Sequence, residues 1–255
     1  MDLQLKGKTA FISGSSQGIG FAIAEQLLQE GAAVIINGRN KEKLDQAVAQ
    51  LRSLGMVSGI AGDIATIVNE IPPVDILVNN VGIFDLQSFF DLTDEDWLHF
   101  FNVNVMSSVR LSRALMPFML EKKWGRIIFI SSESGVNIPA NMIHYGMTKT
   151  AMLSISRGLA QLTKGTQVTV NTILGGPTYS DGVKSAVEQI AAAQHIPADQ
   201  LKENIFNATN PGSLLGRFLN PSEMAQLAAY LASPLSIATN GAALRADGGV
   251  LNTIL

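Results

Sequence analysis

Short apolar runs alternate along this chain with longer stretches in which apolar residues recur at helical spacing. Such an alternation is typical of βαβ units, where each parallel strand is followed by a helix that crosses back over the sheet. The apolar runs predict strands at residues 9–13, 33–37, 57–61, 75–79, 126–131, 167–173 and 242–247. We therefore expect an α/β fold, with a doubly wound parallel sheet of about seven strands and helices on both faces.

The stretches between these runs predict the helices, at residues 19–30, 41–54, 93–123 and 145–162. Pro117 should interrupt the third of them, because proline has no backbone N–H to donate and its ring clashes with the preceding turn. Only a stub of helix fits between Asp63 and the pair Pro72-Pro73. That short stretch belongs to the edge of the sheet, and we assign no function to it.

A long segment from Gly175 to Asn220 contains helical pieces but no predicted strand. Long excursions between strands commonly carry the substrate site, so we expect a lid over about residues 178–218. Its apolar side chains either line that site or form the buried faces of two short helices. Three earlier phenylalanines either border the same pocket or belong to the core. The residues concerned are Tyr179, Val183, Val187, Ile190, Leu201, Ile205 and Phe206, with Phe84, Phe89 and Phe90. No linker divides the chain, so residues 1–255 are expected to form one domain.

Composition and charge narrow the functional classes. Hydrophobic residues make up 47% of the 255 and charged residues only 15%, which suggests that partner subunits cover part of the surface. The net charge of -3 gives no strong field for nucleic acid or an anionic membrane. No stretch has the length of a membrane span and no leader pattern opens the chain, so we expect a cytoplasmic protein. Cysteine is absent, which excludes thiolate catalysis, and the three scattered histidines do not suggest a metal site.

A glycine-rich turn joins the first predicted strand to the first predicted helix. Its glycines allow a tight turn and a close backbone approach, which would place a pyrophosphate at the positive N-terminus of the helix. The candidate phosphate-binding residues are Gly14, Ser15, Gln17, Gly18, Ile19 and Gly20. Taken alone, the pattern fits an ordinary strand-to-helix loop about as well as it fits nucleotide binding.

Tyr145 and Lys149 stand four residues apart in a predicted helix, thirteen residues after Ser132. Residues at that spacing share one face of a helix, so the ammonium of Lys149 can lie near whatever the phenol of Tyr145 contacts. A free phenol has a pKa near ~10 and is a weak acid at neutral pH. An adjacent ammonium favours the phenolate, so we expect a lowered pKa and an acid suited to protonating a carbonyl oxygen. Each residue alone could equally be an ordinary surface or strand-end residue.

These motifs together resemble the short-chain dehydrogenase/reductase family, whose turn reads T-G-x-x-x-G-x-G and whose active site carries Y-x-x-x-K. Asn79-Asn80-Val81-Gly82 resembles the N-N-A-G of that family, and Asn104 in Asn102-Val103-Asn104 matches the asparagine of its fourth-helix motif. The resemblance covers nearly the whole chain. It implies a single-domain Rossmann-type fold, a nicotinamide cofactor, a small-molecule carbonyl or alcohol substrate, and assembly as a homodimer or homotetramer.

The resemblance also implies roles for single residues. Tyr145 would act as general acid or base, Lys149 would also hold the nicotinamide ribose, Ser132 would bind the substrate oxygen, and Asn104 would anchor a water. Besides the glycine turn, cofactor contacts would come from Asn80, Gly82, Tyr145, Lys149, Gly176 and Thr178. One departure weakens this assignment at the nicotinamide end: Gly175 stands where the family usually has proline, which should make that loop more flexible.

The end of the second predicted strand bears on the choice of cofactor. In an NAD-preferring site, an acidic residue roughly ~20 positions after the glycine turn binds the adenosine ribose. This chain has no acidic residue there. Arg39 instead offers a guanidinium that can donate two parallel hydrogen bonds to the 2′-phosphate of NADP. We therefore favour NADP over NAD, although Arg39 could simply be a solvated charge. By resemblance Asp63 and Ile64 would contact the adenine, and Asp63 could also cap the stub helix.

The leading hypothesis is an NADPH-dependent oxidoreductase that transfers a hydride between the cofactor and a carbonyl or secondary alcohol. Reduction of a 3-oxoacyl thioester is an alternative within the same class. A different class is also open, because a protein of this fold could bind the dinucleotide without turnover and serve as a sensor or scaffold. The presence of all four candidate catalytic residues argues against that second class.

Overall fold

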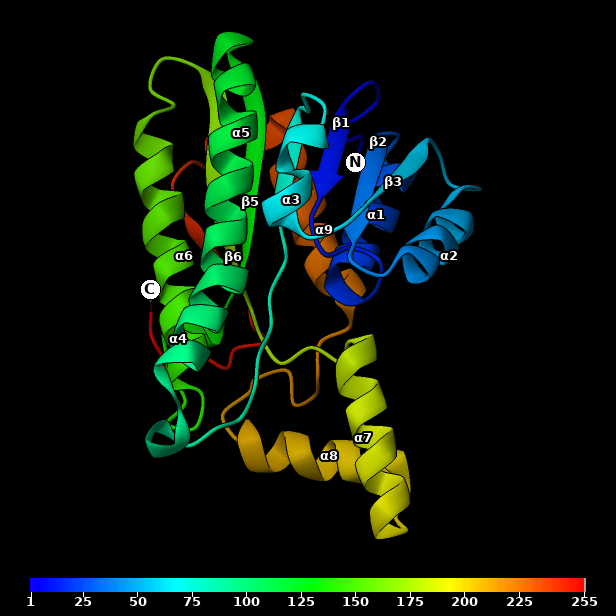
Figure 1. The fold of residues 1–255 in the computed structure, drawn as a ribbon, viewed down its shortest axis with the longest axis vertical. Helices are drawn as coiled ribbons and strands as arrows, with labels where there is room; N and C mark the ends of the chain where they lie inside the picture. The colour runs from blue at the N-terminus through cyan, green and yellow to red at the C-terminus, as the bar shows by residue number, and fades with distance from the viewer. Residues whose placement is uncertain (255) are drawn as a thin grey trace.

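A parallel sheet runs through the centre of the computed structural model, which describes residues 1–254 (Figure 1). Its strands are β1 (Thr9–Ile12), β2 (Ala33–Gly38), β3 (Val57–Ala61), β4 (Ile76–Asn79), β5 (Trp124–Ser132), β6 (Gln167–Gly175) and β7 (Ala243–Ala246). They lie in the order β3-β2-β1-β4-β5-β6-β7, and each neighbouring pair is parallel. This order reverses direction between β1 and β4, so the doubly wound fold predicted from the alternating runs is confirmed.

Helices cover both faces of the sheet. They are α1 (Gly18–Gln29), α2 (Lys41–Leu51), α3 (Ile64–Ile67), α4 (Asp94–Phe100), α5 (Ser107–Glu121), α6 (Ile143–Gln161), α7 (Asp181–Gln194), α8 (Ala198–Thr209) and α9 (Pro221–Ala232). Helices α1, α2 and α9 share a core with one face of the strands, and α3, α5 and α6 share a core with the other. Within residues 1–254, no helix is both long enough and apolar enough to cross a membrane.

The two cores follow from the alternation of side chains along each strand. Ile12 of β1 is buried against the α1 side, while its neighbour Phe11 is buried against the α5 side. Ile128 and Phe129 of β5 divide in the same way. A strand that is buried on both faces reads as a continuous apolar run, which is why these runs were visible in the sequence.

The long helical region differs from the prediction. Its regular α-helix gives way at Phe101–Met106, which forms a π-helical segment between α4 and α5. Pro117 lies inside α5 and does not end it. The proline is on the exposed side of the helix, where water can satisfy the carbonyl that its missing N–H leaves free. The expected interruption at Pro117 was therefore wrong, and the break falls instead where Asn104 enters the site.

The sixth strand is longer than predicted and ends at Gly175. This residue pairs with Ser132 on one side and Ala246 on the other, so it belongs to the sheet and not to a loop; the flexibility expected at Gly175 stays a prediction. A Cβ atom at this position would lie 2.5 Å from the terminal methyl of Met224. A larger residue here would require the flexible end of the Met224 side chain to move.

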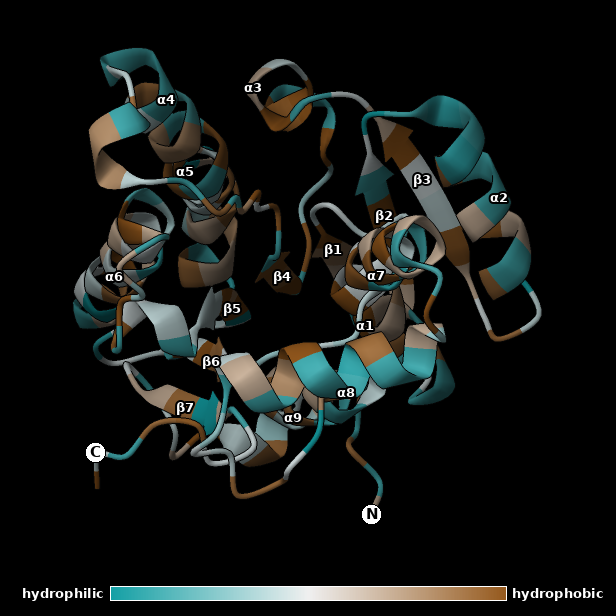
Figure 2. Cartoon of the chain, turned by 90° about the horizontal axis from the view of Figure 1, so that it is seen from below, coloured by the Kyte–Doolittle hydropathy of each residue, from teal (hydrophilic) through white to brown (hydrophobic). Residues whose placement is uncertain are grey.

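Residues 178–218, the segment predicted as a lid and called the lid segment below, form α7 and α8 with their flanking loops; their role as a lid stays a prediction. Figure 2 looks onto the carboxyl edge of the sheet, and these two helices lie in front of that edge. Val187, Ala191 and Leu201 form a small core between the helices, joined by Tyr179, Val183 and Ile205. Most of the predicted apolar lining therefore packs within the lid segment.

Candidate active site

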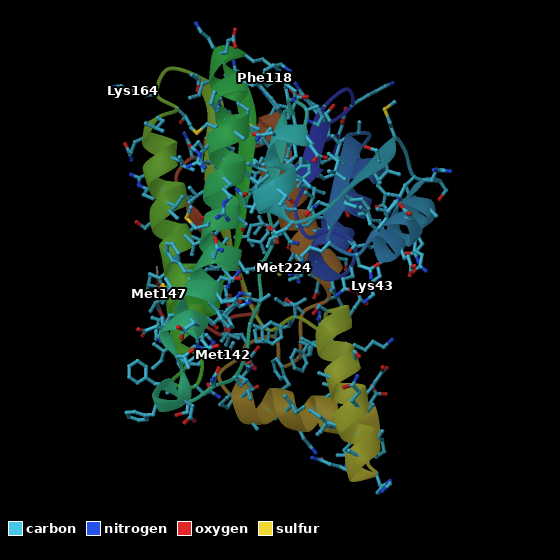
Figure 3. All side chains as sticks on the ribbon, in the orientation of Figure 1. Lys43, Phe118, Met142, Met147, Lys164 and Met224 are labelled. Carbon is cyan, nitrogen blue, oxygen red and sulfur yellow. The ribbon has the colours of Figure 1, made fainter. Side chains whose placement is uncertain are left out.

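The candidate site residues gather at the carboxyl edge of the sheet, where the strand order reverses between β1 and β4. Ligands of open α/β sheets bind in the crevice at such a switch point. The glycine turn after β1, the loop after β4, the end of β5 and the first turns of α6 all meet there. Met142 and Met147, which flank Tyr145 along the chain, lie at the end of α6 that is nearer to the lid segment (Figure 3).

The glycine turn is held by Asn37, a buried residue of β2. The backbone N–H of Ser15 donates to the carbonyl of Asn37 at 2.7 Å, and the Asn37 N–H donates to Ser15 Oγ at 2.9 Å. The Asn37 side chain accepts from the N–H of Gly14 at 3.2 Å and donates to two carbonyls at the end of β3. Sequence reasoning missed this residue. A polar side chain at the end of a buried strand was the available signal.

Gly20 and Asn80 meet behind the same turn. Asn80 Nδ2 donates to the carbonyls of Ser13 and Gly14 at 3.0 and 2.8 Å. A Cβ atom on Gly20 would lie 2.5 Å from that nitrogen and 2.7 Å from the Gly14 carbonyl oxygen. Asn80 therefore ties the loop after β4 to the turn, and only glycine at position 20 leaves it room.

The N-terminus of α1 is suited to an anion such as a pyrophosphate. The N-cap residue Gln17 makes no side-chain hydrogen bond to this helix, and the first turn of the helix holds no acidic residue. Gly18 adopts a φ of +63°, which favours glycine, between the exposed Gln17 and the partly buried Ile19. The Gly18 N–H donates to a carboxylate oxygen of Asp181 at 2.8 Å. A negatively charged oxygen thus already fits this position, and a bound pyrophosphate would compete with Asp181 for it.

The residues predicted for the adenosine end lie beyond β2 and β3. Arg39 is exposed, and no acidic side chain within residues 1–254 forms an ion pair with it. Asp63 Oδ1 accepts from the N–H of Ala65 at 2.9 Å, so the predicted helix cap is confirmed. Ile64 is buried in the core below. The adenine contacts of Asp63 and Ile64 stay predictions.

Ser132, Tyr145 and Lys149 converge at the end of β5. Lys149 Nζ lies 5.5 Å from the centre of the Tyr145 ring and donates to the carbonyl of Ile130 at 3.1 Å. A Cβ atom on Gly82 would be 3.3 Å from this nitrogen. The absence of a side chain at Gly82 therefore leaves space beside the buried ammonium of Lys149.

Asn104 lies in the π-helical segment and is fully buried. Its Oδ1 accepts from the N–H of Ile83 at 2.8 Å, and its Nδ2 donates to the Ile83 carbonyl and to Thr148 Oγ1, each at 3.0 Å. The side chain thus joins the loop after β4 to α6 beside Lys149. The wider turn of the π-helix places Asn104 at this junction, and its predicted role in holding a water stays a prediction.

The pKa values correct one expectation. Burial raises the pKa of Tyr145 to about 12; a hydrogen bond with Ser132 opposes the rise and the charge of Glu133 adds to it. Lys149 does not offset this, because its ammonium is directed to the Ile130 carbonyl and burial lowers its own pKa to about 8. The predicted lowering of the phenol pKa was therefore wrong for this structure.

The nicotinamide end of the predicted site is built by the segment after β6. Gly176 packs against the backbone of Asp247, where a Cβ atom would be 2.6 Å from the Asp247 carbonyl oxygen. The hydroxyl of Thr178 donates to the Gly176 carbonyl at 2.9 Å and so points back into its own loop. Ser180 lies close to Gly18, with its Cβ 3.6 Å from where a Cβ of Gly18 would be. The contact of Thr178 with the cofactor stays a prediction.

One aromatic residue, Phe84, and one acidic residue, Glu133, lie next to the candidate catalytic residues. Phe84 lies edge to face with Tyr145, with ring centres 6.4 Å apart, and borders the site, whereas Phe89 and Phe90 are exposed and contact each other. Glu133 accepts a hydrogen bond from the hydroxyl of Ser132 at 2.8 Å. Sequence reasoning missed Glu133, although a carboxylate directly after the candidate serine was a signal. Within residues 1–254, no group of three metal-ligating side chains is suited to a metal ion.

The doubly wound sheet, the glycine turn at the N-terminus of α1 and the group around Tyr145 define a dinucleotide-binding oxidoreductase of the Rossmann type. The sequence profile of the short chain dehydrogenase family matches residues 8–191. The chain belongs to that family, and it is an oxidoreductase with a nicotinamide cofactor.

The relatives cover all or nearly all of the chain. The uncharacterized oxidoreductase YvrD of Bacillus subtilis (strain 168) is 47% identical, with all of both chains covered. The D-beta-hydroxybutyrate dehydrogenase of Cupriavidus necator is 32% identical, over 96% of this chain and 98% of its own. The crystal structure of L-sorbose reductase from Gluconobacter frateurii, in complex with NADPH and L-sorbose, matches with a TM-score of 0.93 at 29% identity, again over both whole chains.

Proposed function

We propose that this protein is an NADPH-dependent reductase of a small carbonyl compound, or the corresponding dehydrogenase of a secondary alcohol. The observation that carries the proposal is the convergence of Ser132, Tyr145 and Lys149 beside the N-terminus of α1, where the Gly18 N–H already donates to an anionic oxygen. The NADPH-bound L-sorbose reductase of the same fold supports it, as a protein that reduces a carbonyl with this cofactor.

Each of the three residues has a separate task in the reduction. The bound nicotinamide supplies the hydride for the carbonyl carbon. Ser132 orients the carbonyl oxygen, and Tyr145 donates its phenolic proton to that oxygen. A pKa of about 12 keeps the phenol protonated in this structure, so its proton is available, but it also makes the phenol a weaker acid than free tyrosine. To stabilise the phenolate that remains, the ammonium of Lys149 has to turn from the Ile130 carbonyl, which it contacts in this structure, toward the Tyr145 oxygen, where its opposite charge would offset the cost of a buried anion.

Arg39 makes the choice of cofactor testable. Fluorescence titrations of the purified protein should show NADPH binding at least about tenfold more tightly than NADH, equivalent to about 1.4 kcal/mol. Replacement of Arg39 by Ala should remove most of this difference by weakening NADPH alone, because only NADPH carries the 2′-phosphate. The same change at Arg52, an exposed residue at the end of α2, is the matched control and should leave both affinities unchanged.

The outcomes of this titration separate two conclusions. Equal affinity for the two cofactors, or tighter NADH, would contradict the preference for NADP and leave the catalytic group in place. Failure to bind either cofactor would contradict the proposed reaction as a whole.

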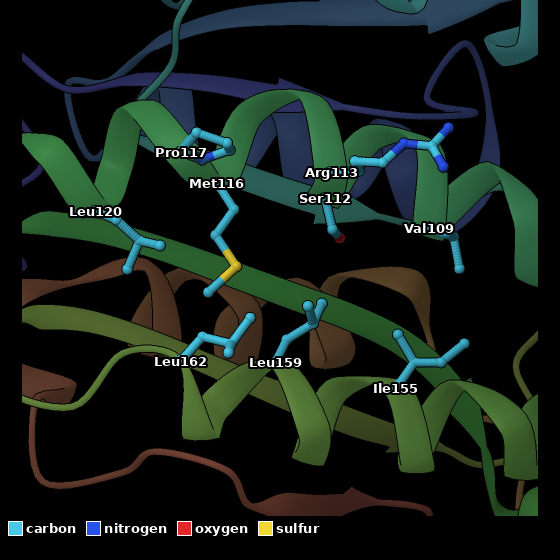
Figure 4. Close-up of a pocket in the computed structure, with 9 residues that line it drawn as sticks. All are labelled: Val109, Ser112, Arg113, Met116, Pro117, Leu120, Ile155, Leu159 and Leu162. Atoms are coloured by element: carbon cyan, nitrogen blue, oxygen red, sulfur yellow. The ribbon is translucent and has the colours of Figure 1, made fainter.

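We also propose that a second copy of the chain covers an apolar groove between α5 and α6 (Figure 4). The groove has a volume of about 280 Å³ and is lined by Val109, Ser112, Arg113, Met116, Pro117, Leu120, Ile155, Leu159 and Leu162. Burial of such a surface would account for the apolar composition of the chain. Light scattering should give a multiple of the 27.2 kDa monomer, and Leu159→Glu should reduce it. Leu235→Glu, at an exposed leucine near α9, is the control; a monomeric wild type would overturn the proposal.

A further inference from the structure

Glu133 is a carboxylate inside the catalytic group that the proton transfer does not use. It follows Ser132 directly and begins the 3₁₀ turn Glu133–Gly135 at the end of β5. The Ser132 hydroxyl donates to Glu133 Oε2 at 2.8 Å and accepts from the N–H of Ser134 at 3.1 Å. A serine hydroxyl has one proton to donate. In this structure the serine donates that proton to the Glu133 carboxylate in a hydrogen bond.

The surroundings leave Glu133 without a cation. Among the salt bridges within residues 1–254, none involves Glu133. Asp247, the acidic neighbour, is already satisfied by Arg245 and by the N–H groups of Gly249 and Leu251. Burial raises the pKa of Glu133, hydrogen bonds from the adjacent serines lower it, and the charge of Asp247 raises it further. An additional hydrogen-bond donor would therefore stabilise this carboxylate.

Ser132 faces a conflict that a substrate can resolve. To orient a carbonyl oxygen, the Ser132 hydroxyl must donate its hydrogen bond to that oxygen and no longer to Glu133. A substrate without a hydrogen-bond donor draws the Ser132 hydroxyl away from Glu133. The Glu133 carboxylate then has one hydrogen bond fewer, which costs free energy in a partly buried place. A substrate that brings a hydroxyl next to its carbonyl can replace Ser132 at the carboxylate and release the serine proton.

We propose that Glu133 selects ketones that carry a hydroxyl group on the carbon adjacent to the carbonyl. The substrate hydroxyl donates to the Glu133 carboxylate, and Ser132 turns its proton to the carbonyl oxygen. Glu133 is thus a specificity-determining residue, and the substrate class is the hydroxylated ketones. This inference rests on the proposed function, because it concerns the substrate side of the same reaction.

The test compares ketones in which a methyl group replaces the hydroxyl. The pairs are hydroxyacetone with 2-butanone, and 2-hydroxyacetophenone with propiophenone, each reduced with NADPH. For the wild type, kcat/KM for the hydroxylated member should exceed that of its partner by about tenfold or more, as expected for a hydrogen bond to a charged group. In Glu133→Leu the ratio should fall to about one, and the plain ketone should be reduced faster than by the wild type because Ser132 is released.

A second variant and a second readout keep the result interpretable. Glu133→Gln retains the size and one acceptor oxygen but not the charge, so its ratio should lie between those of the wild type and the leucine variant. In melting experiments on the NADPH complex, 1-phenyl-1,2-ethanediol should stabilise the wild type more than 1-phenyl-1-propanol, and the difference should vanish in both variants. Glu121→Gln, an exposed glutamate at the far end of α5, is the matched control.

The outcomes are distinguishable. An unchanged ratio in both variants, or a wild type that prefers the plain ketones, overturns the role of Glu133 while the oxidoreductase activity stands. Absence of turnover with every ketone overturns the proposed function and this inference with it. If Glu133→Leu does not fold, the ratio and the melting difference measured for Glu133→Gln decide.

Discussion

Replacement of Tyr145 by Phe should lower kcat/KM for carbonyl reduction by roughly 10²- to 10⁴-fold, the range expected for loss of a positioned general acid. The substitution removes one oxygen and keeps the ring, so its contact with Phe84 and the fold of α6 should persist. In the proposed reaction the phenol gives its proton to the substrate oxygen, and it lies beside Ser132 and Lys149. Steady-state reduction of a carbonyl panel with NADPH measures the effect.

The same variant distinguishes an enzyme from a sensor. Cofactor affinity, measured by fluorescence titration, should change little, because the glycine turn and the ammonium of Lys149 are untouched. Tyr230→Phe removes a hydroxyl from an exposed position on α9 and is the control for loss of a phenol elsewhere. Turnover that persists at the wild-type rate in Tyr145→Phe would contradict the assigned acid, and a wild type that binds cofactor without any turnover would favour the sensor.

The fold was predictable because its cause is visible in the sequence. Strands buried on both faces need unbroken apolar runs, and each of the seven strands overlaps a predicted run closely. The errors fall where a tertiary contact decides. The break in the long helical region lies around Asn104, whose side chain bonds to the backbone of Ile83. The sixth strand continues to Gly175 because β5 and β7 pair with it on both sides. Neither contact partner can be read from the local pattern.

The site was predictable in its positions and less so in its electrostatics. The spacing of Tyr145 and Lys149 places both on one face of α6, because residues four apart in a helix lie one above the other. Spacing does not say where an ammonium points, and here Nζ is directed to Ile130. The pKa of the phenol therefore moved in the opposite direction to the prediction. Glu133 and Asp181 were missed for the same reason, since each acts through a contact that exists only after folding.

Lys149 combines a large expected loss of activity with an expected gain in stability. Its side chain is 5% exposed, and burial lowers the pKa from 10.5 to about 8, so the charged form is held in the fold at a cost. Replacement by Met keeps the length and apolar part of the side chain but removes the charge. Reduction should fall by at least roughly 10²-fold, because the proposed reaction loses the cation that would turn to the phenolate of Tyr145 and stabilise it.

The stability of Lys149→Met should change in the opposite direction and depend on pH. Below pH 8 the lysine is protonated in both the folded and the unfolded chain, so the full cost of burying the charge is present. Between pH 8 and 10.5 the folded protein has released the proton and the unfolded chain still holds it, so the wild type gains stability as pH rises. At pH 7 the variant should therefore be more stable, by on the order of 2 kcal/mol, and the difference should shrink above pH 8.

Thermal melting at pH 7 and pH 9.5, without added cofactor, measures this difference. Lys164→Met is the control, because Lys164 is exposed at the end of the molecule away from the lid segment (Figure 3). A variant that is less stable than the wild type at pH 7 would show that the bond from Nζ to the Ile130 carbonyl outweighs the burial cost. If the expected signs are found, the buried ammonium is retained for its part in the reaction, since the fold alone would be more stable without it.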